Sequence, residues 1–208
     1  MSFSEKVAAY LIKNKEIKND DQQEILVFGA QVFFGLLSGI VITLLVGYLI
    51  KVHVQVFYML LVSIFIRKTA GGAHSEDPFH CLLITVFVYN LLAYIAIKTN
   101  FLIQDYMGLI ILFTFFYGAI VVYLKAPVES PQKPLSDQQK KILRSLSFLV
   151  VLSLLLFQSI SYFYNGNQLN NYAISLIVIW QYLMLTSSGD RLMLFLDKYL
   201  NIIIPKRR

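Results

Sequence analysis

Long runs of apolar residues dominate this chain of 208 residues and decide the class of structure that it can adopt. Three of the longest cover residues 26–50, 79–97 and 142–164. A helix needs about 20 apolar residues to cross the hydrocarbon core of a bilayer, and each of these runs has roughly that length. Hydrophobic residues make up 57% of the chain and charged residues only 14%, which is outside the usual composition of soluble domains. The sequence therefore predicts an all-α polytopic membrane protein.

Six segments are predicted to cross the membrane, namely residues 26–50, 53–66, 79–97, 103–124, 143–164 and 172–188. The second segment is short, so it can be a tilted helix or a re-entrant element. The basic residues support counting it, because cytoplasmic loops collect Lys and Arg. With six crossings, all but two of the 18 basic residues fall on one side, and only Lys51 and Lys98 fall on the other. This predicts a multi-pass protein of the cell membrane with both termini in the cytoplasm.

We expect residues 1–208 to form a single integral-membrane domain. It begins with an amphipathic segment at residues 1–25 and four spans within residues 26–124. A Pro-rich cytoplasmic linker follows at residues 125–142, and residues 143–208 hold two spans and a basic C-terminal tail. In the first part, Phe3, Val7 and Leu11 follow helical spacing. This spacing suits a helix that lies on the membrane surface, and a short solvated arm is the alternative.

The first predicted span carries a stripe of mostly small residues at intervals of four, namely Gln31, Gly35, Gly39, Thr43 and Gly47. These residues share one helix face, and small side chains let helix backbones approach closely in lipid. The stripe is therefore a packing surface, either within the helix bundle or between the two subunits of a homodimer.

The chain has one cysteine, Cys81, which follows His74 by seven residues. Asp77-Pro78 is typical of a helix start, with Asp77 at the N-cap and Pro78 at the first helical position. Cys81 then falls near the first turn, where free backbone N–H groups and the helix dipole favour a thiolate. The pattern predicts a nucleophilic Cys81 with His74 as its base.

In a continuous helix, the seven-residue offset would separate His74 from Cys81 by about 10 Å, which is too far for proton transfer. The chain must therefore bend, and Gly71-Gly72 and the turn before Pro78 supply the freedom to do so.

Two other interpretations of Cys81 remain open at this point. One is an inert buried thiol that packs like a hydrophobic side chain. The other is a metal site with His74, Glu76 and His80, although no standard ligand spacing is present and no metal is predicted. Gln31 in the first span can donate to an oxyanion or orient His74, or it can be a hydrogen-bonded packing residue.

The chain resembles the accessory gene regulator protein B family, the membrane cysteine endopeptidases that process quorum-sensing pro-peptides in Gram-positive bacteria. The resemblance covers nearly the whole chain and rests on Gly29-Ala30-Gln31, Arg67-Lys68, Gly71-Gly72-Ala73-His74, Cys81, Lys125-Ala126-Pro127 and Lys133-Pro134. It implies that Cys81 is the nucleophile and His74 its partner. One departure is the linker, where some members carry several consecutive lysines and this chain has only Gln132-Lys133.

The resemblance implies a thiol protease whose active site faces the cytoplasm. It would cleave an AgrD-like precursor peptide through a thioester on Cys81 and promote its cyclisation to a thiolactone or lactone autoinducing peptide. Neither a cofactor nor nucleic acid is expected to bind. Membrane lipid is a second expected partner, because anionic lipid explains the basic cytoplasmic side as well as an acidic precursor does. The candidate substrate-binding residues are Arg67, Lys68, Gly71, Gly72, Lys125 and Lys133.

Two other functions remain as alternatives. Six spans with intramembrane Gln31, Asn90, Gln158 and Gln181 would suit a small transporter or channel component. The spans lack the paired acidic and basic residues that usually mark an ion path, which argues against transport. A membrane thiol acyltransferase that acts on lipid would carry the same cysteine at a helix start, and only its substrate would distinguish it.

Overall fold

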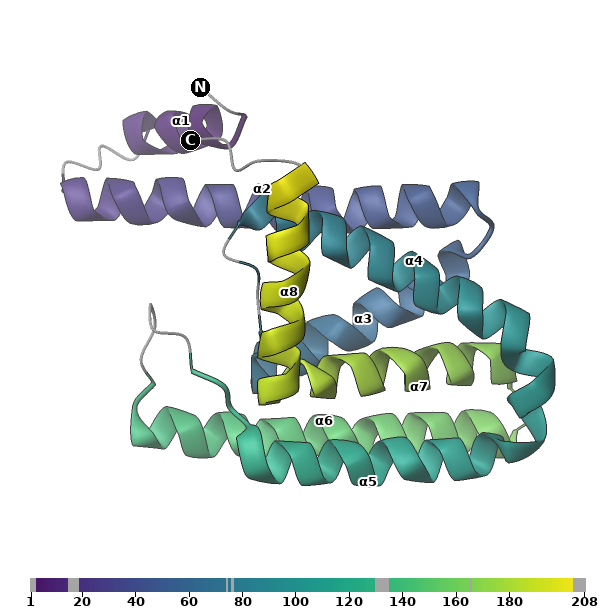
Figure 1. Ribbon diagram of the computed structural model, residues 1–208. Helices are drawn as coiled ribbons and strands as arrows, with labels where there is room; N and C mark the ends of the chain where they lie inside the picture. Colours follow the sequence, from purple (N-terminus) through teal and green to yellow (C-terminus); the bar gives the residue numbers. More distant parts are fainter. Residues whose placement is uncertain are drawn as a thin grey trace. The chain divides into compact units, whose positions relative to one another are not determined.

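The computed structural model describes residues 3–14, 19–73, 75, 77–129, 135–164 and 166–203. These residues form helices joined by short turns, with no strand among them (Figure 1). The predicted all-α class is confirmed. The chain divides into two compact units, residues 1–42 and residues 43–208. The expectation of a single integral-membrane domain stays a prediction.

The first unit contains α1 (Phe3–Asn14) and most of α2 (Asp20–Leu49), which continues into the second unit. The N-terminal helix predicted from Phe3, Val7 and Leu11 is therefore present. Its place on the membrane surface stays a prediction.

The second unit contains the end of α2 and the elements that follow it. These are α3 (His53–Ala70), α4 (Pro78–Ile103), the short 3-10 helix η1 (Gln104–Tyr106), α5 (Met107–Lys125), α6 (Asp137–Phe163), α7 (Gln168–Leu183) and α8 (Ser187–Ile203).

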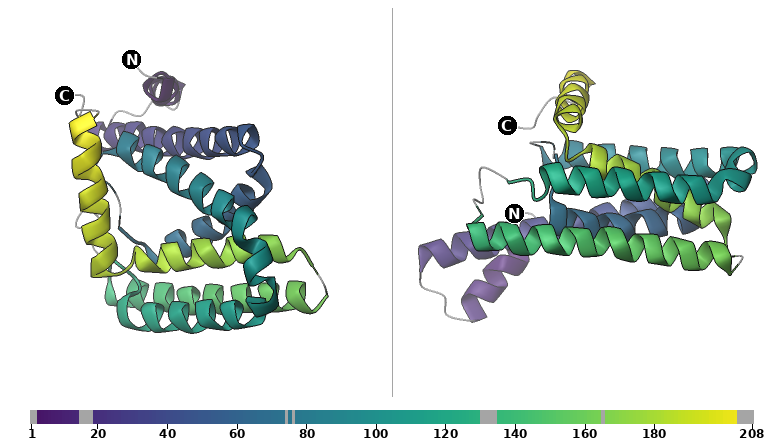
Figure 2. Two further views of the ribbon diagram at one scale, coloured as in Figure 1. Left: turned by 45° about the vertical axis from the view of Figure 1, so that its right-hand side comes forward. Right: turned by 90° about the horizontal axis from the view of Figure 1, so that it is seen from below.

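Consecutive helices from α3 to α7 run in opposite directions, so the turns of the second unit gather at two ends (Figures 1 and 2). At one end, Gln55 Nε2 near the start of α3 donates to Asn170 Oδ1 near the start of α7, at 3.1 Å. At the other end, the Val128 N–H, just after α5, donates to the Ala70 carbonyl at the end of α3, at 2.9 Å. Such alternation is what repeated membrane crossing requires.

Helix α7 forms the centre of the second unit and contacts α3, α4, α5 and α6. Most of its side chains from Asn171 to Tyr182 are buried. From α6, Gln158 Nε2 donates to the Asn171 carbonyl at 3.0 Å and to Ser175 Oγ at 2.9 Å. Hydrogen bonds of this kind stabilise helix association where lipid offers no alternative partner.

The C-terminal part of the small-residue stripe packs inside the second unit. Thr43 and Gly47 are buried there, and Asn90 Nδ2 of α4 donates to the Thr43 carbonyl at 3.2 Å. A Cβ atom on Gly47 would lie 3.1 Å from Asn90 Oδ1 and 3.2 Å from His53 Cα, so a larger residue would separate these helices. For these two residues the stripe serves packing within the chain, while the homodimer stays a prediction.

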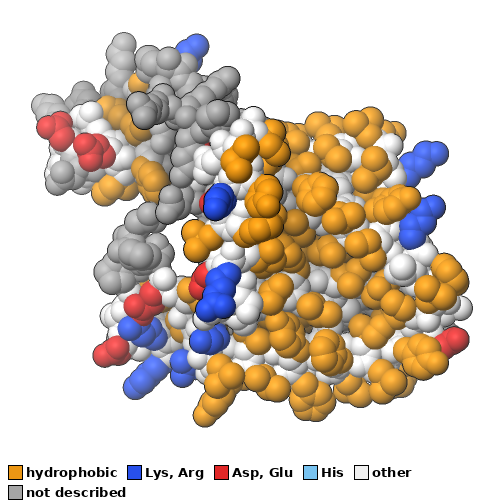
Figure 3. All heavy atoms as spheres, viewed as in Figure 1, with side chains coloured by type: hydrophobic (Ala, Val, Ile, Leu, Met, Phe, Trp, Pro, Cys, Tyr) orange, Lys and Arg blue, Asp and Glu red, His pale blue; other side chains and the backbone are white. Residues whose placement is uncertain are grey.

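Hydrophobic side chains cover most of the visible face of the second unit, and Lys and Arg side chains lie toward its sides (Figure 3). Within the described residues, three helical segments are long and apolar enough to cross a membrane, namely Gln22–Leu49, Pro78–Lys125 and Asp137–Phe163. The bent pair α7 and α8 adds a fourth if it is taken as one span. These helices fit a membrane protein, while the number of six crossings and the side of the termini stay predictions.

The predicted end of the sixth span, at residue 188, is wrong. Helix α7 ends at Leu183, and α8 leaves it at an angle of 92° (Figure 2). Gly189 at this corner is buried, and a Cβ atom there would collide with the Leu183 carbonyl oxygen. Much of the predicted basic tail is therefore helix α8, and the tight corner depends on a residue without a side chain.

Helix α6 begins inside the predicted linker, residues 125–142, whose place on the cytoplasmic side stays a prediction. Ser136 and Gln139 form a capping box, in which the Ser136 hydroxyl accepts the Gln139 N–H and the Gln139 side chain accepts the Ser136 N–H. This reciprocal cap starts α6 at Asp137, before the first apolar residues of the predicted span.

A glycine-to-alanine pair in α5 tests the packing around α7. A Cβ atom on Gly118 would lie 2.6 Å from a ring carbon of the buried Tyr182, whereas one on Gly108 would lie 3.8 Å from Tyr162. We expect Gly118→Ala to destabilise the protein by about 1–3 kcal/mol through overpacking. Gly108→Ala should change stability by less than about 0.5 kcal/mol. Thermal unfolding of both variants in detergent measures this, and equal stability would contradict the packing.

Candidate active site

The chain leaves helical geometry directly after α3. Gly71 and Gly72 have φ angles of +79° and +136°, values that residues with a Cβ rarely adopt. A Cβ atom on Gly71 would also lie 2.8 Å from the Val128 carbonyl oxygen. The described residues between Ala70 and Pro78 are not helical, so the bend that the sequence requires is present.

Two backbone hydrogen bonds anchor the start of this bend. The Ala70 carbonyl accepts the Val128 N–H at 2.9 Å, and the Ala73 N–H donates to the Met184 carbonyl at 2.7 Å. The first bond ties the bend to the segment after α5, and the second ties it to the corner between α7 and α8. His74 follows directly in the sequence and lies outside the described residues.

The predicted start of α4 is confirmed. Asp77 is the N-cap, its carboxylate accepts the Phe79 N–H at 2.7 Å and the His80 N–H at 3.4 Å, and Pro78 opens the helix. The prediction of free N–H groups beside Cys81 is wrong, because the cap uses them and the Cys81 N–H donates to the Asp77 carbonyl at 3.0 Å. Donors for an oxyanion must therefore come from elsewhere.

Cys81 is a half-buried free thiol on α4. Thr85 and Tyr89 follow it at intervals of four, so the three side chains share one helix face. Tyr89 is buried. The face of α4 that carries the thiol therefore also carries two hydroxyl groups.

Gln181 of α7 connects this face to α3. Its Oε1 atom accepts from Arg67 Nε at 3.0 Å, and its Nε2 atom donates to the Tyr89 hydroxyl at 2.8 Å and the Ser63 hydroxyl at 2.9 Å. Gln181 is only 1% exposed. A fully bonded buried amide of this kind positions the Arg67 guanidinium, and nothing in the sequence pairs residues so far apart.

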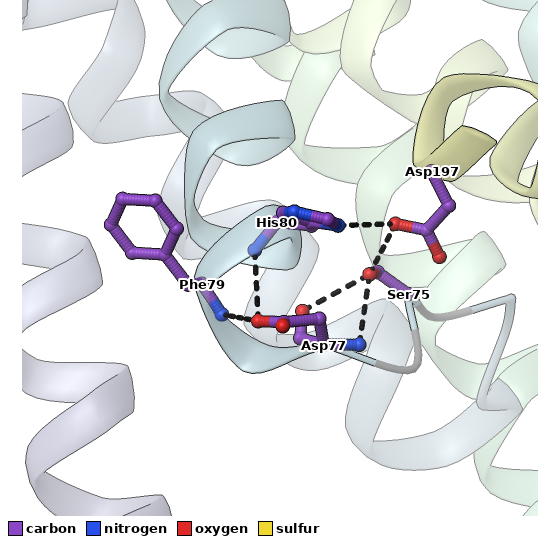
Figure 4. A network of polar contacts seen from close by, with 5 residues as sticks. All are labelled: Ser75, Asp77, Phe79, His80 and Asp197. Carbon is purple, nitrogen blue, oxygen red and sulfur yellow. Dashed lines mark hydrogen bonds and ion pairs between the residues drawn. The ribbon is translucent and has the colours of Figure 1, made fainter. Parts of the chain in front are cut away.

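A second polar cluster lies at the start of α4, and Asp197 of α8 contributes to it (Figure 4). The Ser75 hydroxyl donates to Asp197 Oδ1 at 2.6 Å, and His80 Nδ1 lies 3.3 Å from the same oxygen. His80 and Asp197 are both buried. The sequence indicated neither contact, because Asp197 lies in the predicted tail. An amphipathic pattern over residues 187–203 could have revealed the helix but not its partners.

The remaining candidate residues have the following places. Arg67 is half-buried, Lys68 and Lys125 are exposed near the end of the bundle that carries Cys81, and Lys133 lies outside the described residues. Gln31 belongs to the first unit, where with Gln23 and Val27 it lines an open hollow of about 550 Å³. Its role as an orienting or oxyanion residue stays a prediction.

Among the described side chains, no group of three or more His, Cys, Asp and Glu residues is arranged to hold a metal ion. The alternative metal site includes His74 and Glu76, which lie outside the described residues.

These observations define a class, an all-helical membrane protein with one free cysteine at a capped helix start beside an anchored bend. The family model for accessory gene regulator B matches residues 4–185, and the chain belongs to that family. Family membership gives it a role in the agr quorum-sensing system and in peptide processing with an AgrD-like partner.

Two proteins of Clostridium perfringens are similar over almost the whole chain. The "Putative AgrB-like protein" of strain SM101 is 28% identical, with 97% of this chain and 96% of the relative covered. The "Putative AgrB-like protein 2" of strain 13 is 25% identical, with 96% of this chain and 97% of the relative covered. No solved structure matches the chain significantly.

Replacing the N-cap of α4 tests the helix start. Asp77→Ala removes the acceptor for the Phe79 and His80 N–H groups, and such a loss typically costs about 1 kcal/mol. Asp77→Asn keeps an acceptor oxygen and serves as the matched control. We expect faster hydrogen–deuterium exchange in peptides spanning residues 79–83 for the alanine variant only. Unchanged exchange in that variant would contradict the cap.

Proposed function

We propose that this protein is a membrane-embedded cysteine endopeptidase that cleaves an AgrD-like precursor peptide at the cytoplasmic side of the membrane. The observation that carries the proposal is the place of Cys81, a half-buried free thiol at the start of α4 and directly after an anchored, glycine-opened bend. The family match over residues 4–185 supplies the class of substrate.

In the first step, His74 takes the proton of the Cys81 thiol, and the thiolate sulfur attacks a peptide carbonyl carbon of the precursor. The carbon–nitrogen bond then breaks, and the leaving amine takes the proton from His74. The C-terminal part of the precursor departs. The N-terminal part stays bound to Cys81 as a thioester.

In the second step, an internal cysteine thiol of the precursor attacks the thioester carbonyl, and its proton returns to the Cys81 sulfur as that group leaves. The product is a thiolactone ring, and an internal serine would give a lactone. Exchanging one thioester for another loses little acyl-transfer energy. Water must be excluded while the thioester exists, and a site at the membrane boundary favours this.

Positive side chains around the site provide a means of binding the precursor. Arg67 and Lys68 occupy the last turn of α3, and Lys125 ends α5. The hydrogen bond between Ala70 and Val128 holds these two helix ends together. We propose that the three cations, together with Lys133 of the linker, attract acidic groups of the precursor. Gly71 and Gly72 would let its backbone approach Cys81.

Co-expression of the chain with a precursor encoded beside its gene tests the proposed reaction. We expect Cys81→Ser and His74→Ala each to lower precursor cleavage by at least about 100-fold, because they remove the nucleophile and its base. His53→Ala is the matched control, since His53 is exposed at the opposite end of the second unit. Cleavage should survive this change. Undiminished cleavage by Cys81→Ser or His74→Ala would exclude the dyad.

A further inference from the structure

Asp197 is the one Asp, Glu, Lys or Arg side chain that is buried among the described residues, with 8% of the residue exposed. A buried carboxylate is costly unless charged or hydrogen-bonding groups compensate it. Asp197 therefore needs specific polar partners, unlike a carboxylate on the solvent-exposed face of α8. For comparison, Asp190 on the same helix is exposed.

Two groups that contact Asp197, from Ser75 and His80, belong to the segment that carries the proposed dyad (Figure 4). Its Oδ1 atom accepts the Ser75 hydroxyl proton at 2.6 Å, a length typical of a charge-assisted hydrogen bond. The same oxygen lies 3.3 Å from His80 Nδ1, and His80 is only 1% exposed. The Ser75 oxygen also accepts the Asp77 N–H at 3.2 Å, which extends the cluster to the N-cap of α4.

These two partners of Asp197 are sequence neighbours of the proposed dyad residues. Ser75 directly follows His74, and His80 directly precedes Cys81. One carboxylate, 122 residues away from Ser75, thus contacts the immediate neighbours of both proposed dyad residues. On its other side, His74 follows Ala73, whose N–H is bonded to the Met184 carbonyl. Residues on both sides of His74 are therefore anchored to the C-terminal part of the chain.

We propose that Asp197 is a positioning residue that sets the approach of His74 to Cys81. It acts through Ser75 and His80 and does not itself touch the substrate. This role rests on the proposed function, because it presupposes that His74 activates Cys81. It makes α8 part of the active site, although the helix lies beyond residue 185, where the family match ends.

The rate at which iodoacetamide alkylates Cys81 at neutral pH tests this role without any precursor. Cys81 is the only cysteine, so the full-length chain in membranes reports its thiolate directly. We expect Asp197→Ala and His74→Ala to slow alkylation several-fold and to a similar extent. The double variant should be no slower than His74→Ala alone, because both changes remove the same interaction. Precursor cleavage by Asp197→Ala should fall by about 100-fold, as a misplaced catalytic group predicts.

Milder changes keep the test decisive if Asp197→Ala fails to accumulate. Ser75→Ala removes one hydrogen bond and should slow both reactions, whereas Ser75→Thr keeps a hydroxyl and should restore them. Asp190→Ala removes an exposed carboxylate from the same helix and should leave both rates unchanged.

The possible failures are distinguishable. Two results would overturn the positioning role and leave the proposed function intact. One is that Asp197→Ala or Ser75→Ala slows alkylation as much in the His74→Ala background as in the native protein. The other is that neither change slows alkylation at all. If His74→Ala alone leaves both alkylation and cleavage unchanged, the dyad itself is wrong, and the role of Asp197 falls with it.

Discussion

The site depends on hydrogen bonding of the non-helical segment between α3 and α4. Within a helix the backbone satisfies its own polar groups, but the buried backbone of a bend must find other partners. Here the Ala70 carbonyl is bonded to Val128, the Ala73 N–H to Met184, and the Ser75 hydroxyl to Asp197. Three distant parts of the chain thus fix one short segment. These hydrogen bonds hold the segment in one conformation, which the proposed function of His74 and Cys81 requires.

The buried polar side chains of the second unit are used mainly for packing. Asn90 bonds to the Thr43 carbonyl, Gln158 bonds to α7, and Gln181 joins Arg67 to Tyr89. With Gln31 and the six predicted spans, these amides were the basis of the transporter alternative, and each of these three bonds to a neighbouring helix. Gln181 also links the Arg67 side chain of α3 to Tyr89, which lies on the same face of α4 as Cys81.

Much of the fold follows from local sequence, since long apolar runs and the Asp77-Pro78 cap indicate where α4 and its neighbours lie. The position of the corner before α8 was missed, because the predicted span was extended to residue 188 across the polar residues Thr186, Ser187 and Ser188. Such residues favour turns, and the sharpness of this turn depends on the close approach of Gly189 to the Leu183 carbonyl, which is tertiary information. The contacts of Asp197 could not be predicted either. Periodicity reports which face of a helix is apolar, whereas the pairing of α8 with Ser75 and His80 is set by tertiary structure.

The central claim is that Cys81 carries the N-terminal part of the precursor as a thioester. Intact mass spectrometry of the full-length protein, quenched with acid during precursor processing, measures this most directly. The account predicts an added mass equal to the N-terminal fragment, located on the peptide that contains Cys81 and removed by neutral hydroxylamine. The thioester claim would be contradicted if the precursor is cleaved and no such adduct forms while product release is blocked. An adduct on another residue would contradict it as well.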